Sequence, residues 1–178
     1  MKTPLYLTAL AIGCLTATAA AQAPATPVSD ALRATEQRYA KNLVAAIEEM
    51  PAEKFGYKPT PAQMSVADIA GHLTEGNDYL CSKIGGVEAP KRAELPKGAS
   101  KEQLVARLKE TFAFCESALA KVNDSDLSAK VPFFGGREVT RAQAMFVTAE
   151  DWADHYSQLA TYLRLNGLLP PTAKRGQE

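Results

Sequence analysis

Hydrophobic residues recur every three or four positions along four stretches of the chain, and this spacing is typical of helices that bury one face. In the first stretch these positions are Leu32, Tyr39, Leu43, Ala46, Ile47 and Met50. Ser29 and Asp30 precede all of them, and the run MPAEKFGYKPTP, rich in turn-forming residues, ends the stretch. The pattern therefore predicts a helix that opens at residues 29–30 and stops in that run.

The other three stretches each begin with a polar pair at the spacing of a capping box, in which two side chains three residues apart satisfy free amide groups. The pairs are Ser65 with Asp68, Ser100 with Gln103, and Thr140 with Gln143. Glycines follow two of these stretches, at Gly85–Gly86 and at Gly167. Three further amphipathic helices are therefore predicted.

The links between the helices indicate how the helices are arranged. The segment GGVEAPKRAELPKG, residues 85–98, contains prolines and glycines and no apolar period, and it is long enough to carry the chain back along the bundle. The segment VPFFGGREV, residues 131–139, is typical of a turn between two short extended pieces. The sequence therefore predicts an all-α fold, a four-helix bundle with a long crossover between helices 2 and 3.

The chain ends differ in composition from the bundle, which we place at residues 29–171. Residues 1–21 have one charge, Lys2, then an apolar run and small residues up to Ala21, which is the layout of a secretory signal peptide. Residues 22–28 are rich in Pro and Ala and predict a flexible leader, and residues 172–178 predict a C-terminal tail. We expect a periplasmic or secreted protein without a membrane anchor after cleavage, or alternatively a lipoprotein modified at Cys14.

Charge and cysteine content narrow the function classes. Loss of Lys2 with the signal peptide leaves 19 of the 20 basic side chains against 20 acidic ones, so no basic surface for a nucleic acid is indicated. Export would let Cys81 and Cys115 form a disulfide, whereas in a reducing compartment they would be two small buried hydrophobic residues.

The stretch DWADHYSQ, residues 151–158, concentrates polar groups in the fourth predicted helix. Asp151 and His155 are four residues apart and therefore lie on one helical face, together with Ala144, Val147, Gln158, Tyr162 and Leu165. Most of these residues are of kinds that are buried, so this face is predicted to point into the bundle. Asp154 lies off that face and is predicted to be solvated.

The chain's other histidine, His72, is predicted to lie on the inward face of the second helix beside Ile69 and Leu73. Two imidazoles and a carboxylate with open coordination positions suit iron(II), zinc or nickel. The residues alone leave two interpretations open, because Asp and His four residues apart on a helix are also common as a simple hydrogen-bonded pair.

Three segments resemble the DinB family, the DinB/YfiT-like bundles: SVADIAGHLTEGNDYL, FFGGREVTRAQA and DWADHYSQLATYLRLNGLLPP. The resemblance spans residues 31–171. It implies a four-helix bundle in which helices 2 and 3 run parallel, and a divalent metal held by three histidines. His72 matches the first ligand and His155 the last, followed by Gln158 as in the family's pattern. The middle position departs, because it is Asp151 here.

The resemblance implies a divalent transition metal, zinc, nickel, iron or manganese, held by His72, Asp151 and His155, with the carboxylate favouring harder ions. Alternatively, the site has decayed and the pair is structural. Relatives that use low-molecular-weight thiols are poor guides to an exported protein, so the enzymatic hypothesis is metal-dependent hydrolysis of a small molecule. Glu75 and Asp154 are the candidate general bases, although both are also typical solvated helix charges.

The rival hypothesis is a non-catalytic exported bundle that binds a small ligand or a protein partner near His72 and Tyr79. Members of the family often pair through helix faces, which makes a homodimer an expectation. Six aromatic residues would either form that surface or belong to the core: Tyr39, Phe112, Phe114, Phe146, Trp152 and Tyr156.

Overall fold

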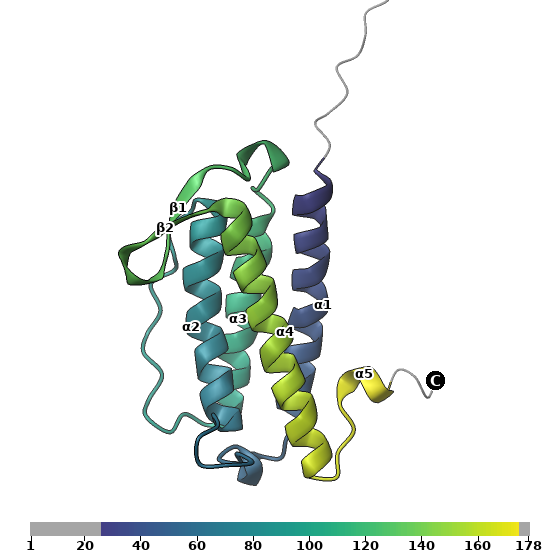
Figure 1. Cartoon of the computed structure of the whole chain (residues 1–178). Coiled ribbons are helices and arrows are strands. Elements are labelled where there is room, and N and C mark those ends of the chain that lie inside the picture. The colour runs from purple at the N-terminus through teal and green to yellow at the C-terminus, as the bar shows by residue number, and fades with distance from the viewer. Residues whose placement is uncertain (1–25, 175–178) are drawn as a thin grey trace, which may run out of the picture.

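A computed structural model describes residues 26–174, and four long helices lie side by side in it (Figure 1). They are α1 (Pro27–Glu49), α2 (Val66–Gly85), α3 (Lys101–Leu119) and α4 (Arg141–Leu165). The predicted all-α four-helix bundle is confirmed. Within the described residues, no helix is long and apolar enough to cross a membrane.

The connections contain short elements. These are the 3-10 turns η1 (Ala52–Lys54), η2 (Asp124–Asp126) and η3 (Phe134–Gly136), the strands β1 (Lys130–Pro132) and β2 (Glu138–Thr140), and the helix α5 (Pro171–Lys174). The two strands pair antiparallel, with Val131 opposite Val139. Gly135 and Gly136 have φ values of 68° and 71°, a left-handed conformation that favours glycine. The predicted turn between two extended pieces is therefore a hairpin.

All three predicted capping boxes are present. At the start of α2, α3 and α4 the Ser or Thr side chain accepts a hydrogen bond from the backbone amide three residues later, and the later side chain accepts one from the capping residue's amide. This reciprocal pairing satisfies amide groups that a helix leaves free at its start. Local sequence therefore fixes where these three helices begin.

The start of α1 differs from the prediction. The helix begins at Pro27, two residues early, because proline is preorganised for the first helical turn. The free amides of Val28 and Ser29 donate to the carboxylate of Asp124, at 3.0 and 2.8 Å. This cap comes from a distant segment, so no local pattern indicates it. The last two leader residues are thus helical, and the predicted signal peptide and residues 22–25 lie outside the described part.

The crossover behaves as predicted. Residues 86–100 return along the outside of the bundle, so that α3 runs parallel to α2, while α1 and α4 run the other way (Figure 1). Arg92 in the crossover holds Asp78 of α2 with Nε at 2.5 Å and Nη2 at 3.1 Å. Arg92 also contacts Glu110 of α3 at 3.1 Å. The crossover is therefore tied to both helices that it connects.

Two predictions about cysteines and the chain end have clear outcomes. Cys81 of α2 and Cys115 of α3 form a disulfide, and both are buried. The tail predicted from residue 172 is partly wrong, because residues 171–174 form α5. Tyr156 donates to Thr172 Oγ1 at 2.8 Å, and Lys174 pairs with Glu49 at 2.6 Å, so α5 is held against α4 and α1.

The inward face of α4 is displaced from its predicted position. The residues Ala144, Thr148, Trp152, His155, Leu159 and Leu163 form its buried stripe. Val147 and Leu165 were predicted to be buried and are exposed, because they lie beyond the edge of this stripe. Trp152 and Phe112 are core residues and not part of any surface. Asp151 consequently lies at the margin of the stripe, beside α2.

Candidate metal centre

The structure brings together the three side chains that the sequence singled out. His72 of α2 and Asp151 and His155 of α4 each offer one ligand atom, and these atoms all lie within 4.8 Å of one another. The carboxylate oxygen Oδ1 of Asp151 is 3.3 Å from Nε2 of His72 and 3.3 Å from Nε2 of His155. One carboxylate oxygen therefore lies between two imidazoles.

Helix geometry explains this convergence. Four residues separate Asp151 and His155, so one turn of α4 stacks them on the same face. Packing of α2 against α4 then brings His72 to them, with its ring centroid 4.8 Å from that of His155. Gly76 lies one turn along α2 from His72, and a Cβ built there would be 3.8 Å from Oδ2 of Asp151. The absence of a side chain at Gly76 leaves the carboxylate uncovered on that side.

Exposure increases across the triad of His72, Asp151 and His155. His155 is buried, Asp151 is half-buried, and the His72 side chain is 48% exposed. The prediction that His72 faces the interior is wrong, because Ile69 and Leu73 occupy the inward positions of that part of α2. The triad is therefore anchored in the core at one end and open to solvent at the other, which leaves room for a further ligand.

The electrostatics keep Asp151 anionic. Burial acts to raise the pKa of its carboxyl group, but hydrogen bonds and charge interactions with His155 and His72 outweigh burial, so the pKa is lowered from its ordinary value. Nδ1 of His155 is buried and has no hydrogen-bond partner among the described residues. Buried polar atoms without a partner are rare, and a catalytic role or an ion or water at the site is among the explanations for one.

The donor set fits a divalent transition metal. Two imidazole nitrogens and one carboxylate oxygen suit zinc, iron, nickel or manganese and leave coordination positions open. Their convergence from two helices distinguishes this group from an isolated Asp–His pair on one helix. The residues present can thus hold such an ion.

A buried hydrogen-bond network behind the triad was not predicted. Trp152, next to Asp151, donates from Nε1 to Oδ1 of Asn77 at 2.8 Å. Asn77 in turn donates from Nδ2 to Oγ1 of Thr111 at 3.2 Å. A tryptophan inside an apolar stripe needs a hydrogen-bond acceptor for its N–H group, so the position of Trp152 in the sequence could have indicated a buried polar partner. The network joins α2, α3 and α4 at the level of the triad.

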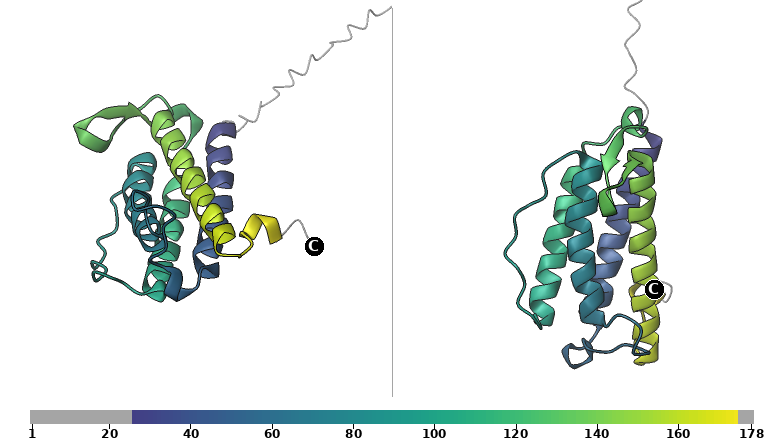
Figure 2. Two further views of the ribbon diagram at one scale, coloured as in Figure 1. Left: turned by 60° about the horizontal axis from the view of Figure 1, so that its bottom comes forward. Right: turned by 60° about the vertical axis from the view of Figure 1, so that its left-hand side comes forward.

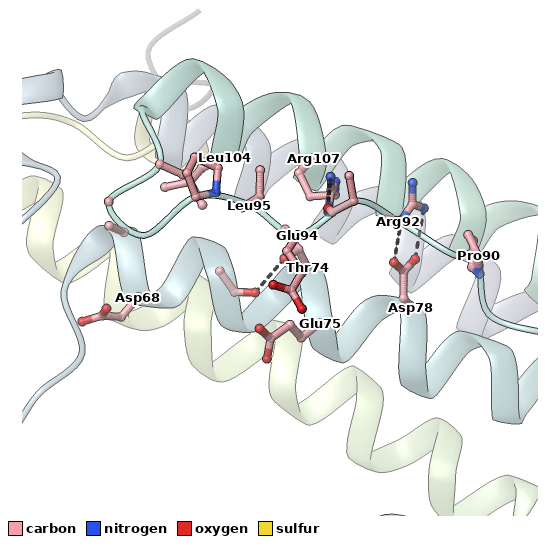
Figure 3. A pocket seen from close by; sticks show the side chains of 16 residues that line it. Asp68, Thr74, Glu75, Asp78, Pro90, Arg92, Glu94, Leu95, Leu104 and Arg107 are labelled. Atoms are coloured by element: carbon pink, nitrogen blue, oxygen red, sulfur yellow. Dashed lines mark hydrogen bonds and ion pairs between the residues drawn. The ribbon is translucent and has the colours of Figure 1, made fainter.

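The two candidate general bases do not belong to the triad. Asp154 is exposed and accepts a hydrogen bond from Gln158 at 2.7 Å, as expected for a solvated position. Glu75 lines a separate cavity of about 670 Å³ between α2, the crossover and α3 (Figure 3). Glu94 and Arg107 also line that cavity. The triad is therefore left without a predicted base.

Comparisons with known proteins agree with this architecture. A family model described as the DinB superfamily matches residues 34–159. No curated protein sequence matches the chain.

Several solved structures are similar in fold. A DinB-like protein from Bacillus cereus has a TM-score of 0.66 and 15% sequence identity, over 80% of this chain and 95% of that one. A DinB-like protein from Bacillus subtilis has a TM-score of 0.62 and 17% identity, over 77% and 92% of the two chains. A conserved protein from Enterococcus faecalis has a TM-score of 0.59 and 17% identity, over 74% and 92%. At such identities the likeness concerns the fold alone.

Proposed function

The chain belongs to the DinB superfamily, and on that premise we propose that it binds one divalent transition metal through His72, Asp151 and His155. One observation carries this proposal, the approach of the three potential ligand atoms to within 4.8 Å of one another. A structural Asp–His pair requires only the two residues of α4. The third side chain, His72, comes from α2 and is half-exposed. A metal ligand can be exposed in this way, because the open side admits a further ligand, whereas a structural hydrogen bond in the core does not need this exposure.

Zinc, nickel, iron and manganese are the candidate ions. An ion held at this site would act as a Lewis acid toward a substrate carbonyl or phosphoryl group. The residues of the chain would then have separate tasks. His155 anchors the site in the core, Asp151 supplies a negative charge, and His72 forms the open edge at which a small molecule enters. Metal-dependent hydrolysis of a small molecule is the activity that this arrangement supports best.

We also propose that the protein is exported to the periplasm or secreted. The Cys81–Cys115 disulfide supports this proposal, because stable disulfides are typical of oxidising compartments. The predicted signal peptide, residues 1–21, points the same way. Recovery of a mature chain that begins at Gln22 from the periplasm or the medium would agree with it, and a full-length cytoplasmic chain would contradict it.

Metal content tests the metal proposal directly. The protein would be purified from its native compartment as the wild type, Asp151→Asn, His72→Ala and Asp154→Asn, and analysed for metals. We expect about one equivalent in the wild type and in Asp154→Asn, and loss of the metal in the other two variants. Asp154→Asn is a matched control, because it removes an exposed carboxylate three residues away on the same helix. A wild type that retains no metal after incubation with these ions would overturn the proposal.

One observation favours the non-catalytic alternative. Neither Glu75 nor Asp154 belongs to the triad, so no general base is assigned there. In that alternative the metal site has decayed, and the bundle binds a small ligand or a protein partner near His72 and Tyr79. A wild type that retains no metal and hydrolyses none of a set of ester, amide and phosphoester substrates would select it.

We further propose that two copies pair through the first turns of α1 and α4. Phe146 is 67% exposed there, at the edge of a groove that it helps to line and whose lining residues include no charged side chain. The lining residues are Val28, Ala31, Leu32, Thr35, Ala142, Met145, Phe146 and Ala149. Two-fold pairing would place each Phe146 in the groove of the other copy. A dimer by light scattering that Phe146→Lys converts to a monomer would support this, and a monomeric wild type would exclude it.

A further inference from the structure

An aromatic cluster lies where the β1–β2 hairpin meets α2. The rings of Tyr79 and Phe134 are stacked, with centroids 4.4 Å apart and an interplanar angle of 24°. Phe133 packs edge-on against Phe134 at 4.9 Å. Phe133 is buried, whereas Phe134 is 45% exposed. The cluster of Tyr79, Phe133 and Phe134, called the aromatic platform below, thus offers an apolar surface to solvent.

Two cations flank the aromatic platform. Nζ of Lys83 lies 5.3 Å from the centroid of Tyr79, and Cζ of Arg137 lies 5.7 Å from the centroid of Phe133. Neither side chain forms an ion pair with a carboxylate in residues 26–174. Glu138 follows Arg137 in an extended segment, where successive side chains point to opposite sides. The positive charge beside the platform is therefore available to an anion.

The platform and the triad lie along one line on α2. His72, Gly76, Tyr79 and Lys83 are spaced by four, three and four residues, which places them on one face of the helix. At 1.5 Å per residue, Tyr79 lies about 10 Å along the helix axis from His72. Between them, Gly76 has no side chain to obstruct this path. Polar ligands, an apolar surface and cations therefore follow one another along a single strip.

The hairpin places the platform over the seam that also holds the triad. β1 contacts both α2 and α4, and Figure 2 (right) shows the hairpin lying along the junction of these two helices. Asp151 and His155 of α4 face His72 across the same junction. A molecule bound at the triad thus has the platform as its neighbour toward the hairpin.

We propose that this strip is the substrate-binding surface, and that the substrate is an aromatic anion. Its polar reacting end lies at the triad, its ring rests on Phe134, and its acidic group faces Lys83 and Arg137. The inference rests on the proposed metal site and adds the class of substrate. Stacking on the exposed ring of Phe134 favours a substrate with an aromatic ring. Two cations without carboxylate partners favour a substrate with an acidic group over one with an amine.

Matched hydroxamates test the proposal, because a hydroxamate chelates metals irrespective of the group attached to it. Calorimetry would measure the binding of four hydroxamates to the zinc-loaded wild type. The first two are acetohydroxamate and phenylbutanohydroxamate. The other two are phenylbutanohydroxamates that carry a carboxylate or a trimethylammonium group on the ring. The phenylbutyl arm spans about the 10 Å between the triad and Tyr79. We expect the ring to tighten binding about tenfold and the carboxylate to tighten it about fivefold further. The ammonium group should give no gain.

Three variants assign these gains to residues. Lys83→Ala should weaken the preference for the carboxylate and keep that for the ring, and Phe134→Ala should remove the preference for the ring. Lys121→Ala is the control, because it removes an exposed cation from the end of α3. If the aromatic platform serves only to hold the hairpin against α2, the Lys83→Ala and Phe134→Ala variants would rank the four hydroxamates in the same order as the wild type does.

Two negative results are distinguishable. Equal binding of all four hydroxamates would overturn the inference and leave the metal site standing. Failure of the wild type to retain zinc would overturn the metal site and the inference together. Thermal unfolding of each variant would confirm that it is folded.

Discussion

The indole Nε1 of Trp152 donates a 2.8 Å hydrogen bond to the side-chain oxygen of Asn77, in the buried layer directly behind Asp151. Asn77 follows Gly76 on α2, and Trp152 follows Asp151 on α4. The bond therefore fixes how far α4 is shifted along α2 at the position where Asp151 must meet His72. A polar bond between two apolar helix faces specifies this alignment more sharply than packing alone does.

Trp152→Phe tests this relationship, because it keeps an aromatic ring and removes the donor. Oδ1 of Asn77 would be left buried without that partner, so we expect a loss of about 1 to 3 kcal/mol in the free energy of unfolding, measured in urea. Zinc affinity should fall as well, while Leu43→Ala, which perturbs the same core from α1 and leaves both partners of the bond in place, should lower stability alone. Unchanged zinc affinity in Trp152→Phe would mean that the bond does not position the triad.

Glu36 makes stability depend on pH. This side chain of α1 is only 2% exposed, and burial, with a smaller contribution from the charge of Glu116, raises its pKa from 4.5 to about 7. The folded state thus retains a proton that the unfolded state releases. The stability associated with the neutral group is fully present below about pH 4.5 and is lost as the pH rises toward 7.

We expect Glu36→Gln to be more stable than the wild type by about 2 kcal/mol above pH 7, and the difference to vanish near pH 4. Urea unfolding at a series of pH values would measure it. Glu116→Gln, at an exposed position, should give only a small part of the gain. A difference that stays constant with pH would show that Glu36 does not bind a proton on folding.

Two glycines of α2 should respond oppositely to alanine. A Cβ at Gly85 would be 2.6 Å from the backbone oxygen of Ala118 on α3, whereas a Cβ at Gly76 meets only Oδ2 of Asp151, at 3.8 Å. We expect Gly85→Ala to destabilise the protein by about 1 to 3 kcal/mol, because α2 and α3 must separate. Gly76→Ala should stabilise it by about 0.5 to 1 kcal/mol through helix propensity. Equal effects on the melting temperature would contradict this account of the α2–α3 contact.

The disulfide should contribute a large part of the stability. Cys81 and Cys115 are 34 residues apart, and closing a loop of that length restricts the unfolded chain by about 4 kcal/mol. The double variant Cys81→Ala, Cys115→Ala should lose an amount of that order in urea. Dithiothreitol should lower the stability of the wild type toward that of the double variant and leave the variant unchanged. A wild type insensitive to the reductant under unfolding conditions would contradict this expectation.

Local sequence patterns predicted the elements of the fold, and contacts between distant segments explain what they missed. The capping boxes at Ser65, Ser100 and Thr140 act within four residues, so they were visible in the sequence. The start of α1 depends on Asp124, more than ninety positions away, so no local pattern showed it. Distance between segments in the sequence therefore set the limit of the prediction.

The same limit applies to the candidate site. The i, i+4 spacing of Asp151 and His155 is a local property. His72 was singled out as the only other histidine, from its place in the second predicted helix, and the resemblance matched it to a ligand position. The exposure of His72 was missed, because helical spacing does not show where a neighbouring helix stops covering a face. The Asn77–Trp152 bond was missed because it joins residues 75 positions apart.

Asp151→His tests what the departure from the three-histidine pattern implied by the resemblance does. A third imidazole in place of the carboxylate raises the net charge of the site by one and makes the donor set softer. We expect zinc and nickel to bind about tenfold more tightly than in the wild type, and manganese to bind more weakly. Competition titrations against a chelating dye would measure each affinity.

Asp154→His provides the control for Asp151→His, because it adds a histidine to α4 at an exposed position outside the triad. It should leave all three affinities unchanged. Gly76, whose Cβ position is 3.8 Å from Asp151, leaves space for the longer imidazole. If manganese binding survives Asp151→His while zinc binding does not rise, the carboxylate is not a ligand, and its role is to hydrogen-bond His72 and His155. If the order of the metals changes as expected, Asp151 sets the metal preference of this chain.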